Sequence, residues 1–165
     1  MLQHRAKIRP LAGLVKVRDR LRREGRRVVL TNGCFDLLHP GHVEYLAAAK
    51  RFGDVLIVAL NGDRSVRALK GCGRPILPQK ARAEMLAALA AVDYIVIFQA
   101  KRATRVMAAL RPDVYVKGGD YRLETLDAQE RAALAACGTR IRLVRLKPGF
   151  STTALVRKIQ RLPKS

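Results

Sequence analysis

One stretch decides how the rest of the chain is organised: Thr31-Asn32-Gly33-Cys34-Phe35-Asp36-Leu37-Leu38-His39-Pro40-Gly41-His42. A short apolar run over residues 27–30 precedes it and predicts a β-strand. The Asn32-Gly33 pair predicts a turn, and the apolar residues that follow Pro40 recur at helical spacing. Proline is tolerated in the first turn of a helix, where its missing N–H would have had no partner. The stretch therefore predicts a strand, a turn and the start of a helix.

This arrangement favours phosphate chemistry. Open α/β sheets bind phosphates where a helix begins just after a strand, and Gly41 allows the backbone to approach a ligand closely. His39 and His42 lie three residues apart, on neighbouring faces of one turn. A lone histidine here would more often be a helix cap or a core residue. Two imidazoles beside free helix amides can instead hold a triphosphate and stabilise the charge that develops at phosphorus, without a protein nucleophile.

The strings Gly33-Cys34-Phe35-Asp36 and His39-Pro40-Gly41-His42 resemble the signature of the HxGH nucleotidyltransferase superfamily, in its cytidylyltransferase-like branch. The resemblance runs from about Val28 to Ile159, which is nearly the whole chain. Within that branch, the chain is most similar to the D-glycero-β-D-manno-heptose 1-phosphate adenylyltransferases. These occur alone or as the C-terminal half of a bifunctional kinase/adenylyltransferase. The resemblance implies that Gly33, Cys34, Phe35 and Gly41 contact the nucleotide and its phosphates.

The order of predicted elements indicates a Rossmann-like α/β fold. Predicted strands are 27–31, 55–60, 94–98, 113–116 and 140–146, and predicted helices are 10–24, 40–51, 64–69, 79–91, 104–110, 128–137 and 151–160. Strands that alternate with helices form a parallel sheet with right-handed crossovers. We therefore expect a five-stranded parallel sheet flanked by helices in a single domain over 1–165. Its core should span about 26–160, after an N-terminal helix at about 10–25, with the active site at the C-terminal edge of the sheet.

Composition restricts the classes of partner. The formal charge is +20, from 33 Lys+Arg against 13 Asp+Glu, which favours an anionic partner such as nucleic acid, a membrane surface or phosphorylated small molecules. The basic residues are scattered, so most of them should be solvated surface and a smaller part should attract phosphates. Hydrophobic residues make up 49% and aromatic residues 5%, which predicts an aliphatic core.

The cysteines and the N-terminus favour the cytoplasm. Cys34, Cys72 and Cys137 are odd in number and widely spaced, which argues against a disulfide framework or a structural zinc site. The segment from Met1 to Lys7 is polar and basic, unlike a signal peptide, and no run approaches a membrane span.

A second phosphate site is predicted where the last helix begins. Ser151-Thr152-Thr153 follows Gly149-Phe150, and hydroxyls with free amides at a helix start can bind an anion. On its own, the pattern is better explained as an ordinary N-cap. It is also similar to the family's closing Ser-Thr-Thr motif, which holds nucleotide phosphates. Cytidylyltransferases open that motif with an Arg-Thr-Glu-Gly-like string, whereas this chain has Lys147-Pro148-Gly149-Phe150, which argues against CTP.

Three further cations are candidates for phosphate contacts. Lys70 and Arg74 lie in a glycine-rich loop that could close over substrate, although the loop alone fits a solvated surface equally well. The family has a Lys-Gly-x-x-Arg-Pro string at this place, which implies a catalytic role for Lys70. Arg82, on the next helix, aligns with an arginine that the family uses near the phosphates. The alternative for Arg82 is a plain exposed helix arginine.

Polar residues at strand ends complete the predicted cleft. The string Lys117-Gly118-Gly119-Asp120-Tyr121 follows the fourth strand, and its glycines would let Lys117 and Asp120 approach a sugar phosphate or a purine edge. Glycine turns after strands are common, but as a string this one is similar to the heptose-phosphate adenylyltransferases. Asn61 and Asp63 end the second strand and should line the cleft. Asp36 either approaches the substrate or serves as a local cap.

The resulting hypothesis is an adenylyltransferase. AMP would pass from ATP to the phosphate of a sugar 1-phosphate, giving ADP-heptose and pyrophosphate for lipopolysaccharide core biosynthesis. Mg²⁺ is expected to bridge the phosphates, and no metal ligand of the protein is predicted. The sequence holds no sugar-kinase segment, so separate kinase and phosphatase proteins are expected. No specific nucleic-acid or membrane partner is expected, and relatives suggest a homo-oligomer.

Two alternatives stay open at this point. A cytidylyltransferase acting on a polyol phosphate such as glycerol 3-phosphate would use the same fold. A basic nucleic-acid-binding module would use the +20 charge, although only four Tyr and four Phe are available to stack on bases.

Overall fold

The centre of the molecule is a five-stranded parallel sheet. The structure is a computed structural model of the chain and describes residues 3–119, 126–145 and 149–163. The strand order is β3-β2-β1-β4-β5. The strands are β1 (Val28–Gly33), β2 (Val55–Asn61), β3 (Tyr94–Phe98), β4 (Val114–Gly118) and β5 (Arg140–Val144). All neighbours pair in parallel, as the predicted Rossmann-like fold requires.

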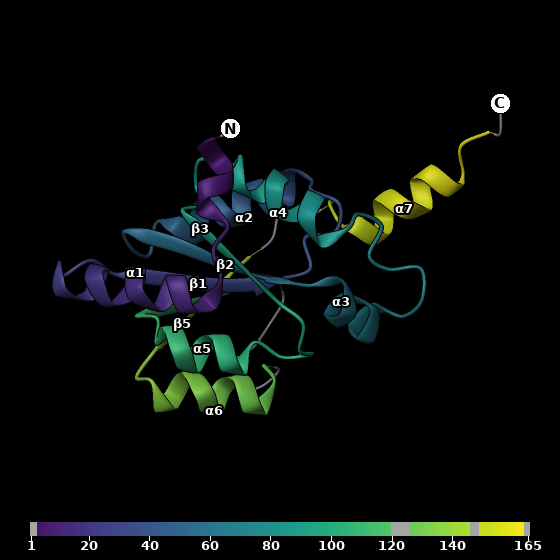
Figure 1. Ribbon diagram of the computed structural model, residues 1–165. Coiled ribbons are helices and arrows are strands. Elements are labelled where there is room, and N and C mark those ends of the chain that lie inside the picture. The colour runs from purple at the N-terminus through teal and green to yellow at the C-terminus, as the bar shows by residue number, and fades with distance from the viewer. Residues whose placement is uncertain (1–2, 120–125, 146–148, 164–165) are drawn as a thin grey trace.

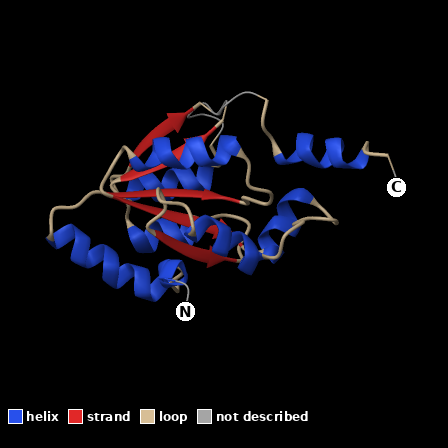
Figure 2. Cartoon of the chain, turned by 90° about the horizontal axis from the view of Figure 1, so that it is seen from above, coloured by secondary structure: helices blue, strands red, loops and turns tan. Residues whose placement is uncertain are grey.

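Helices cover both faces of the sheet. The helical elements are η1 (Gln3–Lys7), α1 (Leu11–Arg23), α2 (Pro40–Lys50), α3 (Asp63–Lys70), α4 (Gln79–Ala87), α5 (Thr104–Leu110), α6 (Ala128–Ala136) and α7 (Thr152–Gln160). Figure 1 shows α2 and α4 on one face and α1, α5 and α6 on the other, and the view in Figure 2 shows helices on both sides of the strands. Because both faces are covered, every residue of β2 is buried.

The period-two alternation of each strand divides the core into two clusters. Val28 and Leu30 pack in the cluster under α1, α5 and α6, whereas Val29 packs in the cluster that contains residues of α2 and α4. Both clusters are mainly aliphatic, as the composition predicts. The register places Val28 opposite Val55 and Gly33 opposite Leu60, so β1 and β2 end side by side. Their carboxyl ends form the edge at which the predicted site residues gather.

Two predicted boundaries are wrong. Asn32 and Gly33 belong to β1 rather than to a turn, because β2 continues beside them and pairs Ala59 and Leu60 with these two positions. Helix α4 ends at Ala87 rather than at residue 91. After it, the chain turns toward β3 through backbone hydrogen bonds that span three residues, as in a 3₁₀ helix. They run from Leu89 N to Leu86 O and from Val92 N to Leu89 O.

The N-terminal segment protects an edge of the sheet. Ile8 forms a parallel bridge with Ile95 of the edge strand β3, and Arg9 N donates to Ile95 O at 2.9 Å. Arg5 holds the segment on α4 through hydrogen bonds to Glu84 of 2.8 and 2.9 Å. An unpaired edge strand invites pairing with another chain. The segment therefore covers part of an edge that would otherwise be open.

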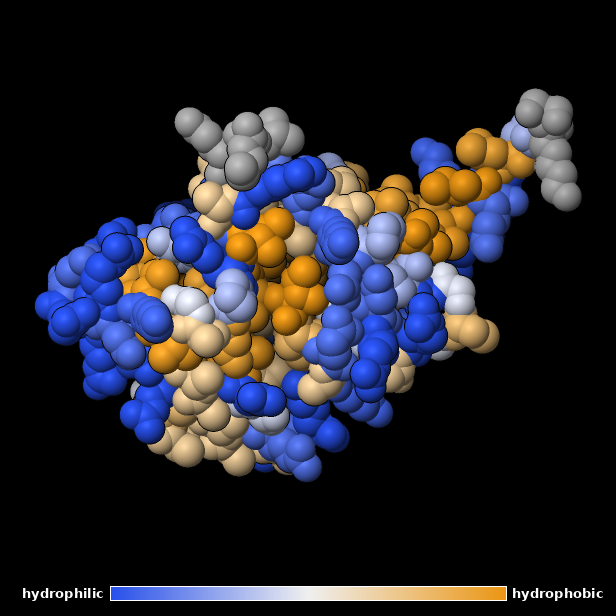
Figure 3. Space-filling model, viewed as in Figure 1, coloured by the Kyte–Doolittle hydropathy of each residue, from blue (hydrophilic) through white to orange (hydrophobic). Residues whose placement is uncertain are grey.

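Helix α7 extends away from the body of the molecule (Figure 1). It has no fully buried residue, and Ile159 is 59% exposed. Figure 3 shows apolar side chains along this projecting helix, with hydrophilic ones beside them. The start of α7, in contrast, faces the carboxyl edge of the sheet and contributes to the site.

Candidate functional site

A cleft of about 550 Å³ opens at the carboxyl edge of the sheet. Its wall is formed by the end of β1, the start of α2, the end of α3, the end of β4 and the start of α7. Fourteen of the predicted site residues line it: Gly33, Cys34, Phe35, Asp36, His39, Gly41, His42, Asn61, Lys70, Lys117, Gly118, Ser151, Thr152 and Thr153. Segments far apart in the sequence thus meet in one hollow, as expected for this class of sheet.

The two histidines stack on each other at the start of α2. Their ring centroids lie 3.8 Å apart with an interplanar angle of 19°. The ring of Phe35 lies tilted against His42, with centroids 5.2 Å apart, and the ring of Phe150 stacks beside His39, with centroids 6.3 Å apart. Phe150 directly precedes the helix start at Ser151, so the ring stack joins the first motif to the start of α7.

Two glycines leave the space that these rings need. A Cβ on Gly41 would lie 3.1 Å from Nδ1 of His39 and 3.4 Å from Cβ of Phe150. A Cβ on Gly33 would lie 2.8 Å from Cε2 of Phe35. Phe35 itself has a φ of 44°, which non-glycine residues seldom adopt. In this structure the glycines of the motif accommodate side chains of the motif itself.

Burial keeps both histidines neutral at physiological pH. Desolvation and the neighbouring His39 lower the pKa of His42 from 6.5 to about 4. Desolvation also lowers the pKa of His39. The Nδ1 atoms of both rings are buried and, among the described residues, have no hydrogen-bond partner. A neutral imidazole keeps one N–H donor and one acceptor, so the pair can bind phosphate oxygens as hydrogen-bond donors.

The floor of the cleft is polar. Asn32 Oδ1 accepts from Tyr115 Oη at 2.5 Å and from Lys117 Nζ at 3.1 Å. Burial lowers the pKa of Lys117, and the nearby Glu130 carboxylate opposes that shift. Burial raises the pKa of the Cys34 thiol, so Cys34 is a poor nucleophile at neutral pH. The floor thus offers hydrogen bonds and a cation rather than a group for covalent catalysis.

The start of α7 combines a cap with an open hydroxyl. Ser151 Oγ accepts from Ala154 N at 3.0 Å, so the N-cap interpretation is confirmed. Ser151, Thr152 and Thr153 also line the cleft. A serine hydroxyl that accepts one hydrogen bond can still donate its proton to a second group. The cap and an anion site are therefore compatible in one residue.

Asp36 fastens the loop that follows α3. Its Oδ1 accepts from Ile76 N at 2.8 Å and from Leu77 N at 3.1 Å, and its Oδ2 accepts from Arg74 Nη1 at 2.7 Å. Burial alone would raise the pKa of Asp36, but the hydrogen bonds from Ile76, Arg74 and Leu77 outweigh it and lower that pKa. Arg74 lines the cleft but is already paired with Asp36, so of the two loop cations Lys70 is the better candidate for a phosphate contact.

Arg82 and Asp63 require a correction. The side chain of Arg82 is fully buried, and neither residue lines the cleft. Arg82 Nη2 donates to Asp63 Oδ1 at 2.8 Å, so the two form an ion pair beneath the cleft wall. The structure therefore places Arg82 neither on an exposed helix face nor at the expected phosphate contact.

The second glycine of the Lys-Gly-Gly string is also displaced from the cleft. Gly119 N donates to Val144 O at 3.1 Å, so this residue continues the pairing of β4 with β5 and does not line the cleft. Asp120 lies outside the residues that the structure describes, as does residue 147 of the string before α7.

Four charged residues of the cleft were not predicted from the sequence. Lys101, Arg102, Asp127 and Glu130 line the cleft, together with Asn32 and apolar residues of α3. Arg102 Nε donates to Asp127 Oδ2 at 2.6 Å, and Glu130 accepts from Ala103 N at 3.0 Å. Lys101 and Arg102 follow β3, so the rule that ligands bind beyond the carboxyl ends of parallel strands would have found them.

The parts of the chain that the structure describes hold neither a metal-binding cluster nor a membrane-spanning helix. No group of three or more His, Cys, Asp or Glu side chains there is placed to hold a metal ion. No helix there combines the length and the apolar character that crossing a membrane requires.

Comparison with known proteins is consistent with this site. The model of the cytidylyltransferase-like family matches residues 30–158. The bifunctional protein HldE of Syntrophotalea carbinolica is 45% identical over 96% of this chain, and the same-named protein of Koribacter versatilis is 47% identical over 93%. HldE of Rhodopseudomonas palustris is 54% identical over 82% of the chain. The matches cover 32%, 31% and 27% of these relatives, so the chain spans about a third of their length.

Solved structures extend the similarity to the fold. A lipopolysaccharide core biosynthesis protein from Thermoplasma volcanium has a TM-score of 0.60 and 27% identity, over 74% of this chain and 98% of that one. A pantoate-β-alanine ligase from Francisella tularensis, described as complexed with β-γ ATP and β-alanine, has a TM-score of 0.57 and 14% identity, over 94% and 78% of the two chains. The second likeness shows the fold alone.

Proposed function

This chain belongs to the cytidylyltransferase-like family, and we propose that it transfers AMP from ATP to D-glycero-β-D-manno-heptose 1-phosphate. The products are ADP-heptose and pyrophosphate, for lipopolysaccharide core biosynthesis. The observation that carries the proposal is the convergence of the His39–His42 stack, Lys70 and the start of α7 on one cleft.

The similarity to known proteins supports this choice of substrate. The relatives named HldE are bifunctional, and the chain matches about a third of their length. A match to about a third of a bifunctional protein is expected if this chain corresponds to its adenylyltransferase half, because heptose 1-phosphate adenylyltransferases also occur as half of a bifunctional kinase/adenylyltransferase. The solved relative from Thermoplasma volcanium is described as a lipopolysaccharide core biosynthesis protein.

The proposed reaction is a direct displacement at phosphorus. An oxygen of the acceptor phosphate attacks the α-phosphorus of ATP, and the bond from that phosphorus to the oxygen bridging to the β-phosphorus breaks. Pyrophosphate leaves with the electron pair of that bond. The acceptor is already an anion at neutral pH, so no general base is needed, and the raised pKa of Cys34 argues against a covalent intermediate.

The residues of the cleft then act by position and charge. His39 and His42 are neutral and donate hydrogen bonds to the triphosphate, and the Ser151–Thr153 helix start binds phosphate oxygens from the other side. Lys70 supplies a positive charge, and none of the described carboxylates lies within ion-pair distance of it. Lys117 and Gly118 are left to contact the base or the sugar.

We propose that Mg²⁺ binds together with the triphosphate and does not occupy a separate site on the protein. The carboxylate of Asp36 lines the cleft but already accepts three hydrogen bonds, and no metal-binding cluster exists within the described residues. The donor set of the cleft thus fits a metal that is held mainly by phosphate oxygens. Such a metal neutralises phosphate charge when ATP binds.

The setting of the reaction is part of the proposal. Cys34, Cys72 and Cys137 are all free thiols, which supports a reducing compartment, and we propose the cytoplasm. We also propose that the chain forms a homo-oligomer. The exposed apolar residues Ile159 and Leu162, at 59% and 60%, support an interface at or next to α7.

Pyrophosphate release tests the function. Purified protein with Mg²⁺ would receive ATP or CTP, each with heptose 1-phosphate or glycerol 3-phosphate, and His42→Ala would serve as the inactive control. We expect release only from ATP with heptose 1-phosphate. Release from CTP with glycerol 3-phosphate would instead establish the polyol-phosphate cytidylyltransferase, and silence of folded protein in all four pairings would reject the proposed acceptor.

A further inference from the structure

We propose that Arg82 is a positioning residue that sets the distance between the two sides of the phosphate site, Lys70 on one side and the histidine pair on the other. The role in catalysis rests on the proposed function, whereas the geometric role does not. Arg82 touches no cleft surface, so it would act entirely through the backbone that it holds.

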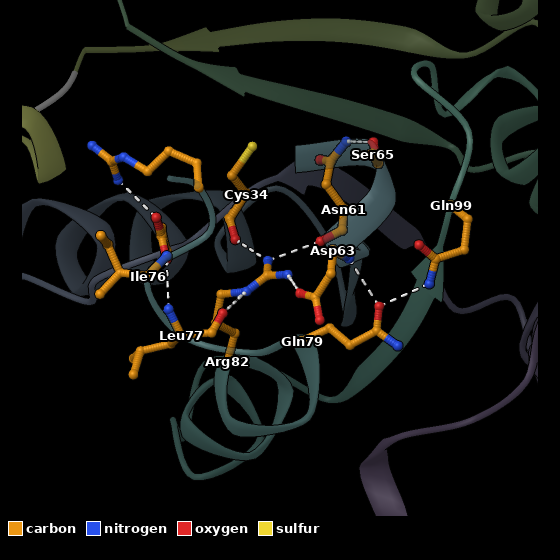
Figure 4. Close-up of polar contacts among 11 residues, drawn as sticks. Cys34, Asn61, Asp63, Ser65, Ile76, Leu77, Gln79, Arg82 and Gln99 are labelled. Carbon is orange, nitrogen blue, oxygen red and sulfur yellow. Dashed lines mark hydrogen bonds and ion pairs between the residues drawn. The ribbon is translucent and has the colours of Figure 1, made fainter. Parts of the chain in front are cut away.

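The guanidinium of Arg82 binds four groups from four different segments (Figure 4). Its Nε donates to Leu77 O at 2.9 Å, and its Nη1 donates to Cys34 O at 2.5 Å and to Asn61 O at 2.8 Å. Its Nη2 donates to Asp63 Oδ1 at 2.8 Å. A single buried side chain therefore joins the turn after β1, the end of β2, the start of α3 and the loop before α4.

Two of these contacts control the catalytic groups. Cys34 O belongs to the turn that leads to His39 and His42, and Asp63 is the first residue of α3, whose last residue is Lys70. A rigid helix transmits the position of its first turn to its last. Arg82 therefore sets where Lys70 stands relative to the histidines.

Asp36 binds the same loop as Arg82, through different backbone groups. Through Ile76 N and Leu77 N, it fastens the loop after Lys70 to the first motif, while Arg82 holds the carbonyl of Leu77. The end of this loop is thus bound through the N–H groups of Ile76 and Leu77 and through the carbonyl of Leu77. Lys70 lies between two fixed points, the start of α3 and this loop.

Only arginine can fill this position. A buried charge is costly unless it is fully paired, and the planar fork of arginine presents its donors in several fixed directions at once. Lysine has three donors on one nitrogen and cannot span four acceptors in four segments. The lysine variant is therefore conservative in charge but not in geometry.

The test compares Arg82→Lys with Arg18→Lys. Arg18 is the matched control, because it is a buried arginine of α1 that does not line the cleft. Hydrogen exchange is measured first, since it needs no substrate. We expect the amides of Ile76 and Leu77 to exchange about tenfold faster or more in Arg82→Lys, with β1 unchanged, because local opening is governed by local bonds. Unchanged exchange at these two amides would overturn the proposal.

The kinetic test uses the same variants with ATP and the acceptor. We expect Arg82→Lys to lower kcat by about 10²-fold with a much smaller change in KM for ATP, since misplacement by about 1 Å can cost that much. In a Lys70→Ala background the further loss should be clearly smaller, because part of the effect of Arg82 acts through the position of Lys70 and only the part that acts through the histidine turn remains. Fully additive losses, or a loss confined to stability as in Arg18→Lys, would contradict the proposal.

A second variant covers the case in which Arg82→Lys does not fold. Asp63→Asn keeps the size of the side chain and removes the charge that Arg82 pairs with, at a residue whose side chain is 33% exposed. We expect Asp63→Asn to change hydrogen exchange at Ile76 and Leu77 and to lower kcat in the same direction as Arg82→Lys, but by smaller factors. If the wild-type enzyme turned over a different acceptor, the exchange result would still decide the geometric claim.

Discussion

At the scale of single residues, burial decides what the motif histidines can do. Both histidines have lowered pKa values because burial desolvates them, and the neighbouring His39 lowers the pKa of His42 further. In the proposed reaction they would therefore bind the triphosphate as neutral donors. The positive charge near the phosphates would then come from Lys70 and from the helix starts.

Replacing His42 by alanine should lower kcat by about 10²-fold or more, as loss of one preorganised charge-stabilising group does. ATP affinity should fall much less, because other groups also hold the triphosphate. Steady-state kinetics and ATP titration would separate the two. Lost ATP binding with retained turnover would contradict the assignment of His42 to the transition state.

The pKa of His42 has a consequence for stability as well. Between pH 6.5 and about 4, His42 is mostly protonated in the unfolded chain and mostly neutral in the folded chain. The stability contributed by neutral His42 is therefore complete above pH 6.5 and declines as the pH falls through this window. We expect the NMR signal of the His42 ring to stay flat from about pH 8 to 5.5, identified by its absence in His42→Gln. A midpoint near 6.5 in the free enzyme would contradict the burial argument.

At the scale of elements, the N-terminal ends of helices line the site, and a side chain from the middle of another helix holds the surrounding segments in place. The starts of α2 and α7 both face the cleft, and Phe150 packs next to His39 between them. Helix α4 contributes no residue to the cleft wall, but its Arg82 ties the first motif to α3. The projecting part of α7 does neither, and its exposed apolar residues favour an intermolecular role.

Ile159→Asp should therefore reduce self-association. It places a charge on the apolar side of α7, whereas Gln160→Asp makes the same change of charge at a neighbouring exposed polar position and serves as the control. Light scattering at equal concentrations should show an oligomer for the wild type and for Gln160→Asp, and a smaller species for Ile159→Asp. If the wild-type protein were a monomer, the proposed homo-oligomer would be wrong. If both variants reduced self-association equally, the proposed interface at α7 would be wrong.

At the scale of the whole molecule, the charge of +20 is much larger than one cleft needs. The cations that line the cleft account for only a small part of it; they are Lys70, Arg74, Lys101, Arg102 and Lys117. The rest lies outside the cleft, and such a surface attracts any polyanion.

We therefore expect weak binding to RNA that depends strongly on salt. The affinity should fall by about tenfold or more between about 50 and 200 mM salt, because several counterions are released on binding. Fluorescence anisotropy with two RNAs of unrelated sequence measures this directly. Binding that persists in high salt, or that discriminates between the two RNAs, would support the nucleic-acid-binding alternative.

The architecture and most of the cleft could be predicted from the order of residues along the chain. Alternating strands and helices prescribe a parallel sheet, and the carboxyl ends of such strands meet at one edge. The first motif, Lys70, Lys117 and the Ser151–Thr153 helix start all lie at that edge, so reasoning along the chain could bring them together. The family resemblance rested on the same local strings and is confirmed by the family match.

Which polar side chains reach the cleft and which lie beneath it depends on packing between distant parts of the chain. Arg82 and Lys70 are both cations close to the site in sequence, yet one is fully buried and the other lines the cleft. The difference arises because the acceptors of Arg82 come from 34, 61, 63 and 77, which meet only after the sheet has formed. Local sequence specifies the direction of a helix face, but burial depends on what packs against that face from elsewhere in the chain.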